Sequence, residues 1–301
     1  MAVLPNRYLV KLDTNTDYFK TYLSYIGALR LTIGSATSIG GAEKSGSKGF
    51  FAKMVKDVPD CYCKINVGAE AEWRTSTKNN DHHPAWNETH DFLIADYDQQ
   101  VLIDIQDDDF AGDDDIGIAT TTVKDILLNG GSKDLDIIHK GELTTAKITV
   151  QAKFFNFIDD VNVLTSTQSG GDEGNLVGLV TILIANVLGL QGRCEELNPS
   201  IKVAWGNREF CTAAKSYSPG TDIFNPSFDQ SFHIPVTADL LVNPPSFRIA
   251  LLNKNCETGF AEIPFSEVLN APALKKEGVF DVGSGATVRA SVSLRGMQLA
   301  G

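Results

Sequence analysis

The chain has 301 residues, which is long for one average domain and sufficient for two. Hydrophobic residues make up 43% and charged residues 21%, a composition typical of folded globular proteins. The formal net charge of −12 excludes a general nucleic-acid binder, whose surface carries the opposite sign. Five widely spaced cysteines do not suggest a disulfide framework, and they favour a reducing, cytoplasmic compartment.

Charge divides the chain into segments. Residues 28–156 carry a net charge of −8 and residues 175–301 a net charge of −1. The segment between them, 157–174, is rich in Ser, Gly, Asp and Thr, which predicts a linker between two domains. Residues 1–27 form a connecting segment without an apolar stretch of signal-peptide length.

Short runs that alternate between apolar and polar residues dominate the chain and predict β-strands. In chain order they are 28–33, 62–67, 100–105, 147–154, 179–184, 200–204 and 246–251. Two short helices are expected, at 122–128 and 265–269. The most apolar run, 176–190, is too short for a confident membrane span and is interpreted as a buried strand, so the chain as given is expected to be soluble. This pattern predicts an all-β sandwich.

The two halves repeat one another in order. HPAWNETHDF at 83–92 corresponds to NPSFDQSFHI at 225–234, and each follows a polar loop. Each is followed by an alternating strand that runs into a polar loop. A period of about 125–150 residues indicates tandem domains, because solenoid units repeat every 20–50 residues.

The most informative segment is the acidic loop DDDFAGDDDIG at 107–117, with six carboxylates in nine positions. Such carboxylates repel one another unless a cation neutralises them, and Ca²⁺ prefers six to eight oxygen ligands. A merely solvated acidic loop is the alternative. An EF-hand is rejected, because its twelfth position would be Ile118 instead of Glu and the flanking segments are strands.

The loop pattern, preceded by Pro-Ala-Trp-Asn-Glu, resembles that of a C2 domain. The turn Asp60-Cys61-Tyr62-Cys63 is similar to the Asp-Pro-Tyr-Val turn of that family, although the proline is absent. The resemblance covers about 28–156 and, more weakly, 175–299. It implies two eight-stranded antiparallel β-sandwiches in tandem, with Ca²⁺-binding loops at one end.

A narrower resemblance is to the extended synaptotagmins and tricalbins. It rests on LPNRYLV at 4–10 and on FAKMVKDVPD at 51–60, which resembles their long first loop. It implies a membrane-tethering or trafficking protein that is anchored in the endoplasmic reticulum near the plasma membrane. The membrane anchor and a lipid-transfer domain would then lie upstream of Met1.

Carried over residue by residue, the family's Ca²⁺ ligands fall on one set of carboxylates. The ligands are Asp60, Asp107, Asp109 and Asp114, with Asp113 as a helper. Lys48 stands near the position of the family's first ligand, and Asp57 is expected to compensate for it.

The loop tips are expected to contact an anionic phospholipid membrane, because apolar and basic residues alternate beside the carboxylates. These membrane-contacting residues are Phe50, Phe51, Lys53, Met54, Val55 and Phe110. The alternative is that Phe50 and Phe51 pack under the long loop.

The second copy has amides where the first has carboxylates. Asn198 stands at the position of Asp60, and Asn253 and Asn255 form the third-loop pair. We expect this half to lack Ca²⁺ and to act as a scaffold or to bind protein partners. No nucleophile-and-base motif or phosphate-binding loop is present, so no catalysis is expected. A Ca²⁺-insensitive interaction scaffold built from both sandwiches remains the alternative function.

Overall fold

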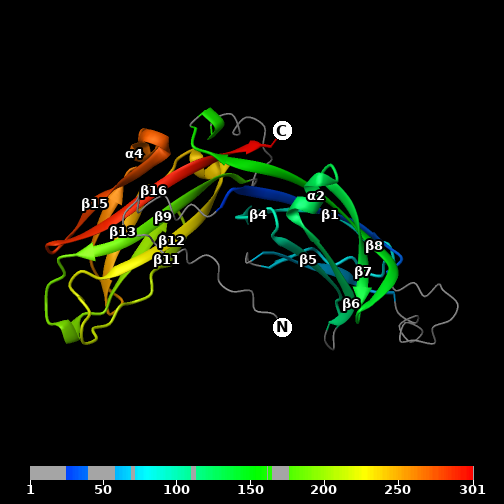
Figure 1. Cartoon of the computed structure of the whole chain (residues 1–301), viewed down its shortest axis with the longest axis horizontal. Coiled ribbons are helices and arrows are strands. Elements are labelled where there is room, and N and C mark those ends of the chain that lie inside the picture. Colours follow the sequence, from blue (N-terminus) through cyan, green and yellow to red (C-terminus); the bar gives the residue numbers. More distant parts are fainter. Residues whose placement is uncertain are drawn as a thin grey trace. The chain divides into compact units, whose positions relative to one another are not determined.

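The computed structural model describes residues 25–39, 58–68, 72–109, 113–160, 162–164 and 176–300. These residues divide into two compact units, Tyr25–Asn156 and Phe157–Gln298 (Figure 1). We call them the first and the second sandwich. The candidate site lies in the first sandwich, and the second provides an internal comparison.

The first sandwich consists of two antiparallel sheets whose strands are far apart in sequence. One sheet has the order β4-β1-β8-β7 and the other the order β6-β5-β2-β3, and a single pair, Ile118 with Ile138, joins β6 to β7. The strands are β1 (Gly27–Thr37), β2 (Cys61–Val67), β3 (Trp73–Arg74), β4 (Ala85–Ile94), β5 (Gln100–Asp107), β6 (Asp114–Thr122), β7 (Ser132–His139) and β8 (Glu142–Ile158).

The core of the first sandwich forms from alternate residues of these strands. In β2, Cys61, Cys63 and Ile65 are fully buried and belong to one apolar cluster with Ile103 and Ile105 of β5. Successive strand residues face opposite sides of a sheet, so the residues between them face away from this core. Tyr62 therefore lies on the outer face of β2, which positions it for the site below.

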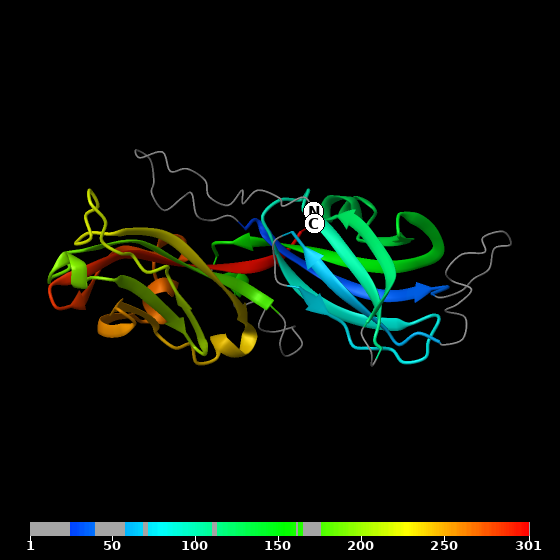
Figure 2. The ribbon, with the colours of Figure 1, turned by 90° about the horizontal axis from the view of Figure 1, so that it is seen from below.

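The second sandwich repeats the arrangement. One sheet has the order β12-β9-β16-β15 and the other the order β11-β10-β13-β14. The strands are β9 (Leu176–Leu188), β10 (Pro199–Trp205), β11 (Arg208–Cys211), β12 (Ser227–Thr237), β13 (Phe247–Asn253), β14 (Cys256–Ile263), β15 (Lys275–Gly283) and β16 (Ala286–Leu299). In the view of Figure 2, turned by 90°, the chain of this unit runs from green at β9 through yellow at β12 to red at β16.

An aromatic stack anchors the core of the second sandwich. The Trp205 ring lies 5.1 Å from Phe247 and 5.8 Å from Phe265, measured between ring centroids. Its indole N–H donates to the carbonyl oxygen of Pro245 at 3.0 Å. The stack satisfies the polar atom of a buried tryptophan and packs α4 (Phe265–Leu269) against the sheet.

Two short helices lie where the sequence predicts them. Helix α2 (Val123–Leu128) begins after Thr122, whose hydroxyl caps it by accepting from the backbone N–H of Asp125 at 3.1 Å. Helix α4 occupies residues 265–269, where the second helix is expected. The strands dominate the described residues, as an all-β class requires. The apolar run at 176–190 forms β9, which ends at Leu188. The fold prediction of two eight-stranded antiparallel sandwiches is confirmed for the described residues.

Candidate Ca²⁺ and membrane site

Strand pairing gathers the predicted ligands at one end of the first sandwich. Asp60 immediately precedes β2, Asp107 is the last residue of β5, and Asp114 is the first residue of β6. Cys61 pairs with Asp107, and Asp107 pairs with Asp114. The segment before β2 therefore ends beside the two stems of the third loop, although it is distant from them in sequence.

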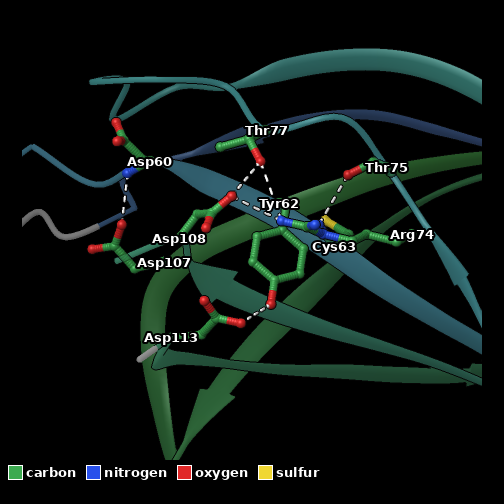
Figure 3. Close-up of polar contacts among 9 residues, drawn as sticks. All are labelled: Asp60, Tyr62, Cys63, Arg74, Thr75, Thr77, Asp107, Asp108 and Asp113. Atoms are coloured by element: carbon green, nitrogen blue, oxygen red, sulfur yellow. Dashed lines mark hydrogen bonds and ion pairs between the residues drawn. The ribbon is translucent and has the colours of Figure 1, made fainter. Parts of the chain in front are cut away.

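Hydrogen bonds hold the stems of the two loops together. The backbone N–H of Asp60 donates to Oδ1 of Asp107 at 2.7 Å, and the backbone N–H of Asp108 donates to the carbonyl oxygen of Asp60 at 2.9 Å (Figure 3). Oδ1 of Asp60 accepts from the backbone N–H of Asn80 at 2.7 Å. These bonds fix Asp60 against Asp107 without a cation.

The electrostatics of Asp107 show that the carboxylates repel one another. Burial raises the pKa of Asp107, and the charges of Asp109, Asp60 and Asp114 raise it further, although the hydrogen bond from Asp60 opposes them. A carboxyl group with a raised pKa is one whose charged form is poorly stabilised. A divalent cation would remove this repulsion.

Two residues that sequence reasoning missed contact the third loop. The Arg74 guanidinium lies over the Tyr62 ring, 3.7 Å from its centroid, and donates to Asp108 at 2.8 Å. The Tyr62 hydroxyl donates to Oδ2 of Asp113 at 2.5 Å. Figure 3 shows both contacts on the outer face of β2. The turn containing Tyr62 was noticed in the sequence, whereas Arg74 carries no sequence signal because its place depends on strand register.

The ligand chemistry fits Ca²⁺, but a formed metal cage is not seen in the described part of the chain. There, no three His, Cys, Asp or Glu side chains lie close enough together to hold a metal ion. The side chains of Asp109, Asp113 and Asp114 are exposed at the rim. The candidate ligands among the described residues are carboxylates on loop stems, and hard oxygen donors suit Ca²⁺ rather than Zn²⁺.

Several predicted residues lie outside the described residues. These are the expected ligand Asp57 and the expected membrane contacts Phe50, Phe51, Lys53, Met54, Val55 and Phe110. Their roles remain predictions.

The second sandwich contains the same stem geometry with amides. The backbone N–H of Asn198 donates to Oδ1 of Asn253 at 2.7 Å, as Asp60 does to Asp107. The third loop differs in length, because only Lys254 and Asn255 separate β13 from β14. Both have positive φ, 50° and 63°, as a two-residue type I′ hairpin requires. This turn has no room for the second half of an acidic loop.

The other candidates in the sequence have structural roles. Cys61 and Cys63 are buried in the core, and burial is the main cause that raises the pKa of Cys61 to about 12. His82 bonds the carbonyl oxygen of Ile39 at 2.7 Å.

Among the described residues, none of the helices is long and apolar enough to cross a membrane.

The two antiparallel sandwiches have the fold of tandem C2 domains. Residues 27–136 match the family model of the C2 domain. Over 172 residues, 56% of this chain, the sequence is 25% identical to human Extended synaptotagmin-3. The match spans 18% of that protein's length.

Solved structures show the same fold over both sandwiches. The calcium-bound C2A and C2B domains of Extended-Synaptotagmin 2 match with a TM-score of 0.71 at 17% identity, covering 92% of this chain and 99% of that one. A structure of the SMP, C2A and C2B domains of Extended-Synaptotagmin 2 matches with a TM-score of 0.70, also at 17% identity, over 92% of this chain and 58% of the other.

Proposed function

We propose that the first sandwich binds anionic phospholipid membranes in a Ca²⁺-dependent manner. The observation that carries this proposal is the buried Asp107 carboxylate, which is held to Asp60 at 2.7 Å and is destabilised by Asp109, Asp60 and Asp114. Carboxyl groups whose pKa is raised by burial and by neighbouring like charges are concentrated at binding and catalytic sites. The fold similarity to the calcium-bound C2A and C2B domains of Extended-Synaptotagmin 2 supports the same ion.

Asp60, Asp107, Asp109 and Asp114 would hold the ion, with Asp57 and Asp113 as further ligands. A bound Ca²⁺ ion supplies positive charge and open coordination positions that phosphate oxygens complete. The protein's own contribution is to bring these carboxylates to one end of the sandwich. Without the ion, the net charge of −8 on residues 28–156 repels an anionic leaflet.

The loop tips would then contact the membrane through Phe50, Phe51, Lys53, Met54, Val55 and Phe110. Full burial of an aromatic ring contributes roughly 1.5–3 kcal/mol to binding, and partial burial in the membrane interface contributes less. Lysine stems lie along apolar surface while their charges reach the headgroups.

The second sandwich has a role that does not need Ca²⁺. Its stems carry Asn198 and Asn253, and its third loop is a two-residue turn. Ca²⁺ affinity depends on the number of charged ligands. Binding of protein partners is the function we assign to this half.

We also propose that the tandem serves a larger membrane-tethering or lipid-transport protein, without catalysis of its own. The domain arrangement of 28–156, linker 157–174 and 175–301 is part of this proposal. The cytoplasmic face of a membrane, with the parent protein anchored in the endoplasmic reticulum near the plasma membrane, is the proposed location. Similarity to an extended synaptotagmin supports this context.

Calorimetric Ca²⁺ titration, together with co-sedimentation with phosphatidylserine vesicles, tests the proposal. We expect Ca²⁺ binding and Ca²⁺-dependent sedimentation of the parent chain, and loss of both in Asp107→Asn/Asp109→Asn. The matched control is Asp96→Asn/Asp98→Asn, which removes the same charge at the opposite end of β5 and should leave both intact.

Absence of binding at millimolar Ca²⁺, with and without vesicles, would contradict the proposal. The Ca²⁺-insensitive scaffold would then be the better description of both sandwiches.

A further inference from the structure

The outer face of β2 carries a tyrosine that is covered although it lies outside the core. Tyr62 is only 1% exposed, and it faces away from Cys61 and Cys63. The Arg74 guanidinium lies 3.7 Å from its ring centroid and the Lys64 ammonium lies 5.4 Å from it. Cations over an aromatic face stabilise its position. The ring is thus held in one place beside the acidic loop.

We propose that Tyr62, held by Arg74, is a positioning residue that fixes the two stems of the third loop for Ca²⁺, through Asp113 on the far stem and Asp108 on the near stem. This inference rests on the proposed function. It assigns to these two residues the part that hydrogen-bonded outer partners play for ligating carboxylates in metal sites.

The first step of the argument is the contact with the far stem of the third loop. The Tyr62 hydroxyl donates to Oδ2 of Asp113 at 2.5 Å, a short bond to a charged acceptor. A carboxylate has two oxygens and about four acceptor positions. The bond from Tyr62 holds Asp113 on the outer face of the sheet, opposite to the face that Asp107 and Asp114 share with Cys61, and it thereby anchors the far stem of the loop. Asp114, the adjacent residue, begins β6 and is a proposed ligand.

The second step is the contact with the near stem. Arg74 donates to Oδ2 of Asp108 at 2.8 Å, and the Thr77 hydroxyl donates to the same oxygen at 2.8 Å. Asp108 lies between the proposed ligands Asp107 and Asp109. One stacked pair, Arg74 on Tyr62, thus contacts the chain on both sides of the third loop (Figure 3).

The third step is the comparison with the second sandwich. Strand register places Ser200 at the position of Tyr62, and Cys211 at that of Arg74. Lys254 replaces Asp108, since it likewise donates its backbone N–H to the residue before the strand. The stack is therefore present where the loop is long and acidic and is replaced where the loop is a two-residue turn. In this chain the stacked pair thus accompanies the long acidic loop, as a positioning role predicts.

The test uses Tyr62→Phe, which keeps the ring and its stacking and removes only the hydroxyl. We expect Ca²⁺ affinity, measured by calorimetry on the full chain, to fall about tenfold. The matched control is Tyr97→Phe in the β4–β5 loop, at the opposite end of β5, which should bind Ca²⁺ as the parent does. Asp113→Asn should weaken binding, and adding Tyr62→Phe to it should cause little further loss.

A second readout does not depend on bound metal. Amide hydrogen exchange of residues 108–114 in the Ca²⁺-free protein should be faster in Tyr62→Phe and unchanged in Tyr97→Phe. Arg74→Lys, which keeps the charge and loses the planar stack, should weaken Ca²⁺ binding about threefold. A thermal melt confirms that each variant is folded.

The outcomes separate the two proposals. Parent-like Ca²⁺ affinity in Tyr62→Phe, or full additivity with Asp113→Asn, would overturn the positioning role while Ca²⁺ binding stands. A parent chain that does not bind Ca²⁺ would overturn the proposed function, and the positioning role with it.

Discussion

At the scale of single residues, Asp107 and Asn253 form the same hydrogen bond with different charge. Each accepts a backbone N–H at 2.7 Å, from Asp60 and Asn198 respectively. The second sandwich therefore shows that an amide satisfies the geometry of this position. The hydrogen bond by itself therefore does not explain the negative charge of Asp107, which favours a functional reason for it.

This comparison predicts the effect of Asp107→Asn. The raised pKa of Asp107 means that the folded state binds its proton more tightly, so stability falls as pH rises from about 3.8 through the raised value. Without Ca²⁺ at pH 7, we expect the variant to be as stable as the parent or up to about 1 kcal/mol more stable. Urea denaturation in EGTA measures this. A clear loss of stability would show that the carboxylate is structural.

His233 provides a pH prediction in the second sandwich. Burial first, and the charge of Arg295 second, lower its pKa to about 4. The unfolded chain takes up a proton near pH 6.5 and the folded chain does not until about pH 4, so stability is lost as pH falls through this window. The loss should approach roughly 3 kcal/mol at the acid end.

His233→Gln should remove this loss between pH 6.5 and pH 4. Denaturation curves at several pH values, compared with the exposed-residue control His83→Gln, measure the difference. Parallel pH profiles for the parent and His233→Gln would contradict the assignment.

At the scale of elements, the β13–β14 turn is built from residues that do not favour it. Lys254 and Asn255 both have positive φ, whereas type I′ turns favour Asn followed by Gly. Lys254→Asn/Asn255→Gly should stabilise the chain by about 0.5–1 kcal/mol without creating Ca²⁺ binding. Chemical denaturation and calorimetry measure the two effects. Destabilisation would mean that the turn has a different conformation.

Gly259 marks a close approach between β14 and β15. A Cβ atom at this position would lie 1.7 Å from the carbonyl oxygen of Val282, which belongs to backbone and cannot rotate away. Gly259→Ala should therefore destabilise the protein by about 1–3 kcal/mol or more. The control is Gly278→Ala on β15, where the nearest atom would be 3.9 Å away. Equal stability of the two variants would contradict this packing.

At the scale of the whole molecule, the two sandwiches have separate apolar cores and unequal charge. Residues 28–156 carry −8 and residues 175–301 carry −1. We expect Ca²⁺ to stabilise the first sandwich alone, by about 2.7 kcal/mol at a concentration one hundred times Kd. The unfolding midpoint of that sandwich should therefore rise. Scanning calorimetry with and without Ca²⁺ measures this, and Asp107→Asn/Asp109→Asn assigns the transition. A shift of the other transition would place the ion in the second sandwich.

The sequence predicted the fold well, because alternation of apolar and polar residues is a local property of each strand. The helices at 122–128 and 265–269 were also predicted, and the structure adds that Thr122 caps the first of them. The candidate site was predicted less completely. Asp60 and Asp107 were found from their motif, whereas the bond between them depends on the pairing of β2 with β5.

The sequence by itself determined the all-β class, the tandem repeat, the acidic loop and its replacement by amides in the second copy, because composition and spacing record these directly. Only the tertiary structure decided that Arg74 stacks on Tyr62, that this pair contacts both stems of the third loop, and that Lys254 and Asn255 close a two-residue turn. The physical reason is register. A shift of one residue in strand pairing would turn Tyr62 into the core and Cys61 outward, and no short stretch of sequence encodes the pairing of distant strands.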